Sequence, residues 1–96
     1  MELTKLDKTI TQEISLALEK NNLLIGFRES YKKLLNNNLS KIYVCNNSRE
    51  DIRLLFENCL KSGEKKINFL DISNEKLGLL SKKPFNVSVV SILKTE

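Results

Sequence analysis

The feature of this 96-residue chain that most constrains its fold is the alternation of four helical patterns with four short strand-like runs. Apolar residues recur at spacings of three and four in the helical patterns, and β-branched and aromatic residues fill most of the short runs. The helices are predicted at residues 3–17, 28–39, 49–62 and 74–80, and the strands at 23–25, 42–45, 67–70 and 87–93. Because alternating helices and strands cover a sheet on both faces, the pattern predicts an α/β fold, a three-layer α/β/α sandwich with a four-stranded mixed sheet.

The length of the chain leaves room for one hydrophobic core and not for a second domain. Hydrophobic residues make up 41% of the sequence and charged residues 29%, which is the balance of an ordinary globular protein. We therefore expect one domain over residues 1–96.

Local signals mark the ends of the predicted helices. Ser48 followed by Asp51 has the form of a capping box, in which the serine hydroxyl would accept a bond from a free amide of the third helix. Gly63 is predicted to close that helix, and Ser73 or Asn74 to begin the fourth.

The rarity of chemically reactive side chains argues against an enzyme. The sequence has no histidine, and Cys45 and Cys59 stand apart from any metal-binding spacing, so we interpret both as reduced core thiols. No phosphate-binding loop or paired catalytic carboxylate stands out. We expect no catalytic activity, no metal, no cofactor and no small-molecule substrate.

The charge of the chain favours a polyanionic partner without naming one. Sixteen Lys and Arg against twelve Asp and Glu give a net charge of +4. The N-terminus lacks the apolar stretch of a signal peptide, and no run approaches the length of about 20 residues that a membrane span needs. The sequence therefore predicts a soluble, intracellular protein with no membrane partner.

Four stretches of the sequence resemble one known family. The stretches are residues 10–20, residues 24–30, the pair Leu77-Gly78, and Lys83-Pro84-Phe85 with the following 87–93. They are similar to the eukaryotic and archaeal large-subunit ribosomal protein family L-thirty-e, within the L-seven-Ae superfamily of kink-turn RNA binders. Lys82 departs from the family pattern, because it replaces a small glycine turn.

The resemblance implies that three loops meet at one end of the sandwich and hold a sharp RNA bend. We call residues 26–30 the first loop, 46–49 the second loop and 82–86 the third loop. The implied RNA-binding residues lie in these loops or one turn beyond them: Gly26, Phe27, Arg28, Glu29, Ser30, Lys32, Asn46, Asn47, Arg49, Lys82, Lys83 and Phe85.

The chemistry of several of these residues is compatible with RNA. Gly26 can adopt a positive φ and allow close approach of a nucleic-acid backbone, beside the electropositive start of a helix. Arg28 and Lys32 lie one turn apart and suit phosphates, and Glu29 could accept hydrogen bonds from a guanine edge. An aromatic ring at Phe85 can stack on a flipped-out base.

Each of these residues also has a purely structural interpretation. Gly26 could be only a strand-to-helix turn, and Asn46 and Asn47 only a loop before a helix. Phe85 could pack beneath the sheet, and Lys82 and Lys83 could be the solvated end of a helix. Sequence alone leaves these alternatives open.

The resemblance implies a structural constituent of the large ribosomal subunit that binds a kink-turn-like rRNA element. Its expected partners are that rRNA and neighbouring ribosomal proteins, with a monomer outside the ribosome. Two other functions in the superfamily are a core protein of guide-RNA particles and a regulator of its own mRNA. A protein-interaction module of the same fold is a further alternative.

Overall fold

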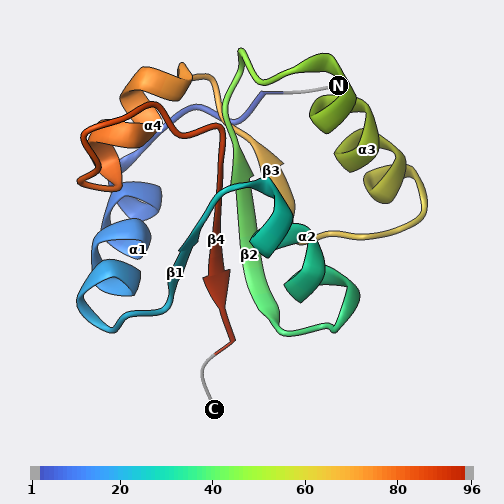
Figure 1. Ribbon diagram of the computed structural model, residues 1–96, viewed down its shortest axis with the longest axis horizontal. Helices are drawn as coiled ribbons and strands as arrows, with labels where there is room; N and C mark the ends of the chain where they lie inside the picture. The colour runs from blue at the N-terminus through green and yellow to red at the C-terminus, as the bar shows by residue number, and fades with distance from the viewer. Residues whose placement is uncertain (1–2, 95–96) are drawn as a thin grey trace.

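The computed structural model describes residues 3–94, and its helices and strands alternate along the chain as predicted (Figure 1). The helices are α1 (Lys8–Glu19), α2 (Phe27–Leu35), α3 (Glu50–Lys61) and α4 (Asn74–Leu80), and the strands are β1 (Leu23–Ile25), β2 (Leu39–Val44), β3 (Ile67–Phe69) and β4 (Val89–Leu93). No helix in this part of the chain is long and apolar enough to span a membrane.

The four strands form one mixed sheet in the order β1-β4-β2-β3. β2 and β3 are parallel, whereas β4 is antiparallel to both of its neighbours. Thr4 extends the sheet beyond β3, since its N–H donates to the Phe69 carbonyl at 2.6 Å and its carbonyl accepts from Asp71 N–H at 2.8 Å. The prediction of a four-stranded mixed sheet is confirmed.

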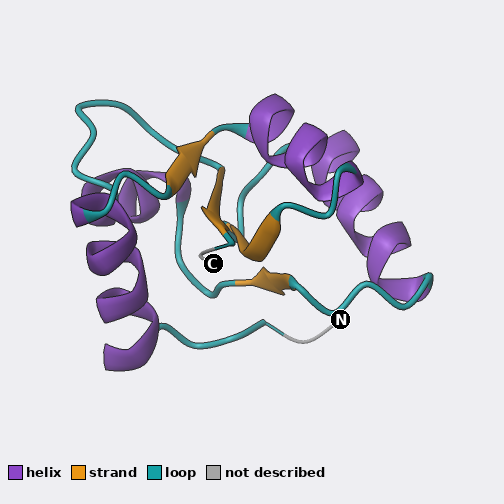
Figure 2. Ribbon diagram, turned by 90° about the horizontal axis from the view of Figure 1, so that it is seen from below, coloured by secondary structure: helices purple, strands orange, loops and turns teal. Residues whose placement is uncertain are grey.

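Helices cover both faces of this sheet, with α1 and α4 on one side and α2 and α3 on the other (Figure 1, Figure 2). Neighbouring residues of β2, and Cys45 directly after it, supply the two cores, because side chains alternate between the faces of a strand. Ile42 and Val44 belong to the core under α2 and α3, and Tyr43 and Cys45 to the core under α1 and α4. The three-layer α/β/α sandwich is therefore confirmed.

Two predicted helices extended too far. The first was predicted from residue 3 but begins at Lys8, because the Asp7 carboxylate accepts the Ile10 N–H at 2.9 Å and Thr4 pairs with the sheet edge. The second was predicted to reach residue 39 but ends at Leu35, and Asn37 turns the chain with a φ of 57°. Leu39 instead begins β2 and is wholly buried.

The predicted capping box at the start of α3 is wrong. The N-cap position is Arg49, so Ser48 lies one residue too early, and its buried hydroxyl oxygen has no hydrogen-bond partner within residues 3–94. The Asp51 carboxylate accepts the N–H of its neighbour Ile52 at 2.9 Å. At other helix ends the predictions are confirmed, with Gly63 at a φ of 100° after α3 and the Ser73 hydroxyl capping α4.

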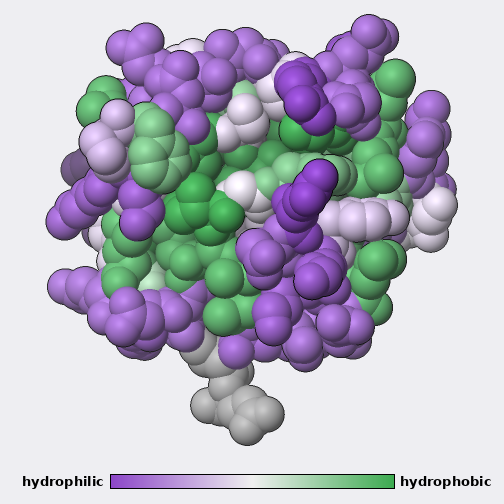
Figure 3. Space-filling model, in the orientation of Figure 1, coloured by the Kyte–Doolittle hydropathy of each residue, from purple (hydrophilic) through white to green (hydrophobic). Residues whose placement is uncertain are grey.

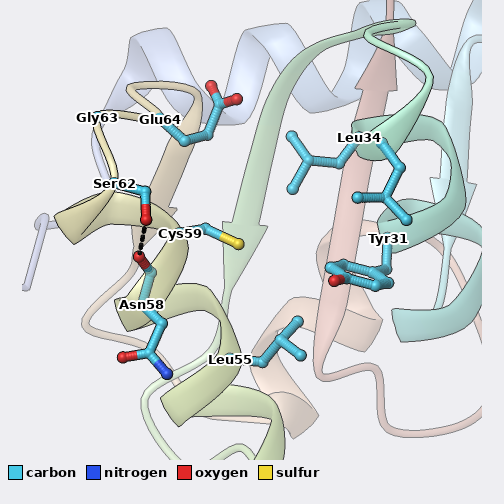
Figure 4. A pocket seen from close by; sticks show the side chains of 9 residues that line it. Tyr31, Leu34, Leu55, Asn58, Cys59, Ser62, Gly63 and Glu64 are labelled. Carbon is cyan, nitrogen blue, oxygen red and sulfur yellow. Dashed lines mark hydrogen bonds between the residues drawn. The ribbon is translucent and has the colours of Figure 1, made fainter.

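Both cysteines are free thiols, as predicted, but they differ in environment. Cys45 is buried in the sheet, and burial raises the pKa of its thiol. Cys59 points from α3 into an open hollow of about 610 Å³ between α2 and α3, which Leu34 and Leu55 also line (Figure 4). Burial raises the pKa of the Cys59 thiol as well.

A polar cluster joins α1 to the sheet. Glu13 on α1 accepts hydrogen bonds from Lys41 Nζ at 2.8 and 3.0 Å and from the Tyr43 hydroxyl at 2.6 Å. Partial burial favours a raised pKa for the Glu13 carboxyl, but the bonds from Lys41 and Tyr43 outweigh it and lower the pKa. The ionised carboxylate therefore connects α1 to β2.

A buried hydrogen bond between two serines fixes α2 on the sheet. Ser30 Oγ on α2 and Ser91 Oγ on β4 are 2.8 Å apart, and both residues are fully buried. Replacing Ser91 by alanine should lower the free energy of unfolding by about 1–3 kcal/mol, because it leaves the Ser30 hydroxyl buried without its partner. Urea unfolding measures this loss.

The double replacement of Ser30 and Ser91 by alanine is the control. It removes both polar groups, so part of the stability lost in the single variant should return. A double variant that loses the sum of the two single effects would show that the two hydroxyls do not depend on each other.

Candidate nucleic-acid interface

The direction of the strands brings the three predicted loops to one edge of the sheet. β1 and β2 are each antiparallel to β4, so the ends of β1 and β2 lie beside the start of β4. The first loop follows β1, the second loop follows β2, and the third loop leads into β4. All three therefore lie at the upper end of the molecule in Figure 1.

Backbone hydrogen bonds tie the first and second loops to the start of β4. Gly26 N–H donates to the Val89 carbonyl at 2.8 Å, and Cys45 N–H donates to the Ser88 carbonyl at 2.9 Å. An open hollow of about 540 Å³ lies between the two loops, and its lining comprises Ile25, Gly26, Phe27, Arg28, Glu29, Arg49, Ile52 and Ser88. A ligand in this hollow would touch both loops at once.

Gly26 shapes the first loop. It is the N-cap of α2 with a φ of 104°, a conformation that favours glycine, and no side chain caps the first turn of the helix. The amides at this end of α2 give it a partial positive charge. Arg28 and Glu29 are exposed beside it, and Lys32 is exposed one turn further along.

Two other residues predicted in the first loop support the helix from inside. The Ser30 hydroxyl is wholly buried against Ser91, so this side chain does not face the hollow. The Phe27 ring stacks on Tyr31 at 5.8 Å and meets Phe56 edge-on at 5.7 Å. Phe27 therefore lines the hollow while its ring packs against the core under α2 and α3.

In the second loop the exposed side chains are already partly engaged. Asn47 Oδ1 accepts the Asn74 N–H at 2.8 Å, and Asn47 Nδ2 donates to Asn74 Oδ1 at 3.2 Å. Asn46 N–H donates to the Ile72 carbonyl at 2.8 Å. Arg49 forms an exposed ion pair with Asp51 at 3.0 Å, a type of contact that a phosphate can displace at small cost.

The third loop presents Phe85 to solvent. Its side chain is 57% exposed, so the alternative in which the ring packs beneath the sheet is wrong. Lys82 adopts a φ of 57° and so makes the turn that glycine makes in the resembled pattern. Lys82 is exposed and Lys83 half-buried, and both lie at the start of this loop.

Two residues of α4 that were not predicted in the site hold this arrangement together. Asn74 bonds the second loop, and Gly78 packs so closely under the third loop that a Cβ there would lie 2.3 Å from the Phe85 carbonyl oxygen. The sequence signal for Gly78 was its place in the Leu77-Gly78 pair, whereas Asn74 stood out only as a helix cap.

The surface of the molecule separates polar from apolar areas. On the face shown in Figure 3, hydrophilic side chains line the upper and lower edges and the area over α2, and apolar side chains gather at the centre, beside α1 and β1. Within residues 3–94, no group of three or more His, Cys, Asp or Glu side chains is placed to hold a metal ion.

Comparison with protein families identifies the group to which the chain is related. The sequence model of the family described as "Ribosomal protein L7Ae/L30e/S12e/Gadd45 family" matches residues 8–96, which is most of the chain. The chain belongs to this family. The match includes all three loops and both supporting residues of α4.

Solved structures show the same fold at low sequence identity. A Bacillus halodurans protein of unknown function superimposes with a TM-score of 0.77 at 13% identity, covering 93% of this chain and 88% of that one. A 15.5 kDa RNA-binding protein of Giardia lamblia superimposes with a TM-score of 0.70 at 16% identity, covering 91% of this chain and 72% of that one. A search of curated protein sequences found no match.

Proposed function

We propose that this member of the family binds RNA, and that its target is a kink-turn-like element of large-subunit rRNA held by the three loops. The observation that carries the proposal is the meeting of the three loops at one sheet edge, with the hollow between Gly26 and Arg49. The family match and the likeness to an RNA-binding protein of Giardia lamblia support it.

Each loop has a distinct chemical part in this proposal. The first amides of α2 and the Arg28 guanidinium would bind phosphates, and Glu29 would accept from a base edge. Arg49 would exchange Asp51 for a phosphate, and Phe85 would stack on an unpaired base. Together these groups would recognise the shape of a bend and a few splayed bases, the usual mode of specific RNA recognition.

The wider role follows from the same proposal. The chain would act as a single structural domain of the cytoplasmic ribosome, without catalysis, next to other ribosomal proteins and as a monomer outside the particle. A role in guide-RNA particles or on its own mRNA would use the same loops with another RNA. The RNA that co-purifies with the native protein distinguishes these roles.

The direct test compares two RNAs of matched length and composition, one with a kink-turn and one a straight duplex. The kink-turn RNA should bind more tightly, and its affinity should fall steeply with salt, because Lys and Arg release counterions from phosphates. Equal binding of the two RNAs would contradict recognition of a bend, and no binding of either would contradict the function itself.

Replacing Phe85 by alanine should weaken kink-turn binding by roughly tenfold or more, because base stacking on an aromatic contributes about 1–3 kcal/mol. Its stability should change little, since the ring is 57% exposed. Leu35→Ala is the matched control, because Leu35 is 68% exposed at the far end of α2. Equal losses of affinity in both variants would exclude a specific role for Phe85.

A further inference from the structure

We propose that α4 is a strut that sets the distance between the second and third loops, and that Asn47 and Asn74 are positioning residues of the RNA site. This inference rests on the proposed function, because a fixed distance between the loops matters only for a ligand that touches both of them. It changes the role of Asn47, which the sequence predicted as a direct contact to RNA.

The joint between the second loop and α4 is a pair of asparagine side chains. Asn74 N–H donates to Asn47 Oδ1 at 2.8 Å, and Asn47 Nδ2 donates to Asn74 Oδ1 at 3.2 Å. Both polar atoms of the Asn47 amide thus bond to Asn74, and these bonds fix the orientation of that side chain. The bonds join residues that are 27 positions apart in the sequence.

The same helix, α4, also holds the third loop at two points. Val87 N–H donates to the Asn74 carbonyl at 3.0 Å, and Lys83 N–H donates to the Gly78 carbonyl at 3.0 Å. Phe85 lies between these two anchored residues. Asn74 therefore bonds the second loop through its backbone N–H and its side-chain Oδ1. It bonds the end of the third loop through its backbone carbonyl oxygen.

These contacts favour positioning over direct contact for Asn47. One N–H and one lone pair of the Asn47 amide remain free, but any base contact that turned the amide would break its two bonds to Asn74, and the Asn74 N–H would lose its acceptor. A site whose contact residues are held by supporting hydrogen bonds binds more tightly, because less freedom is lost on binding. The bonds of Asn47 therefore favour RNA binding indirectly, because they help to hold Phe85 in place.

The test uses Asn47→Ala, Asn74→Ala and the double variant, each as the full chain. In the free protein, hydrogen exchange at the Val87 amide should accelerate roughly fivefold in Asn47→Ala, the equivalent of about one net hydrogen bond. Affinity for the kink-turn RNA should fall by a similar factor in Asn47→Ala, which loses both bonds. It should fall by less in Asn74→Ala, which keeps the bond from its backbone N–H to Asn47 Oδ1, and the double variant should be no weaker than Asn47→Ala.

Three controls make the outcomes decisive. Asn74→Asp keeps the acceptor for Asn47 and the backbone bonds, so exchange at Val87 should stay near the wild-type rate. Asn58→Ala removes an exposed amide from α3 in the hollow of Figure 4 and should alter neither measurement. A loss of affinity in Asn47→Ala with none in Asn74→Ala would overturn the proposal in favour of direct contact.

The exchange measurement separates this inference from the proposed function. An unchanged exchange rate at Val87 in Asn47→Ala overturns the strut even if the protein binds the RNA well. Absence of RNA binding by the wild-type protein overturns the proposed function, whatever the exchange rates show.

Discussion

Replacing Gly26 by glutamate should lower affinity for a kink-turn RNA by about a hundredfold, because like charges brought together at an interface cost several kcal/mol. Gly26 lies at the start of α2, in the hollow between the first and second loops. A carboxylate there would repel phosphates. It would also cancel part of the positive charge that the start of α2 presents to the RNA. Fluorescence anisotropy with labelled RNA measures the loss.

The backbone at Gly26 calls for a matched control. Its φ of 104° is strained for any other residue, so substitution should also cost about 1–3 kcal/mol of stability. Gly63 has a φ of 100°, and at both glycines a Cβ would meet no atom within 4 Å. Gly26→Ala and Gly63→Ala should therefore lose similar stability.

The RNA measurement then separates strain from charge. Gly63→Ala should bind RNA as the wild type does, since Gly63 follows α3 at the end opposite the loops. Gly26→Ala should lose less affinity than Gly26→Glu. If all three variants bind the RNA equally, Gly26 does not face it.

The fold was predictable from the sequence because its pattern repeats in every element. The alternation of helices with β-branched runs gave the right order, and residues 23–25 were placed correctly as β1. The errors fall where an apolar residue fits two patterns. Leu39 stands four residues after Leu35, the spacing of a helix, but it is the first residue of β2 and its side chain is buried there.

The family resemblance implied that the three loops meet at one end of the sheet, and the strand directions account for that meeting, but the contacts that support the loops were not predictable. Loops that follow parallel strands or precede an antiparallel neighbour meet at one edge, and strand order alone brings Gly26, Asn46 and Phe85 to one end of the sheet. The bond between Ser30 and Ser91 spans 61 positions of sequence. Nothing local to Ser30 distinguishes a buried hydroxyl from one that faces a ligand.

Replacing Gly78 by alanine should destabilise the protein by about 1–3 kcal/mol, the usual cost of overpacking. The new Cβ would lie 2.3 Å from the Phe85 carbonyl oxygen and 3.3 Å from the Phe85 carbonyl carbon. Both atoms are backbone, so no change of rotamer relieves the contact, and either α4 or the third loop must move. Thermal unfolding should show a fall in Tm of roughly 4–8 °C per kcal/mol for a domain of this size.

Helix propensity sharpens this prediction, because it acts in the opposite direction. Alanine in a helix interior is favoured over glycine by about 1 kcal/mol, so an open position would gain stability from the same change. Lys76→Ala on the exposed surface of α4 is the control and should leave Tm nearly unchanged. A Gly78→Ala variant as stable as the wild type would mean that the third loop moves at little cost.

The two possible movements have different consequences for RNA. If the third loop moves, Phe85 leaves its place and affinity for the kink-turn RNA falls as in Phe85→Ala. If α4 moves, the bonds between Asn47 and Asn74 stretch, and exchange at the Val87 amide accelerates as well. Because Lys83 and Val87 are both bonded to α4, we expect neither part to move alone: the helix and the loop should each be displaced, away from one another, and both measurements should change.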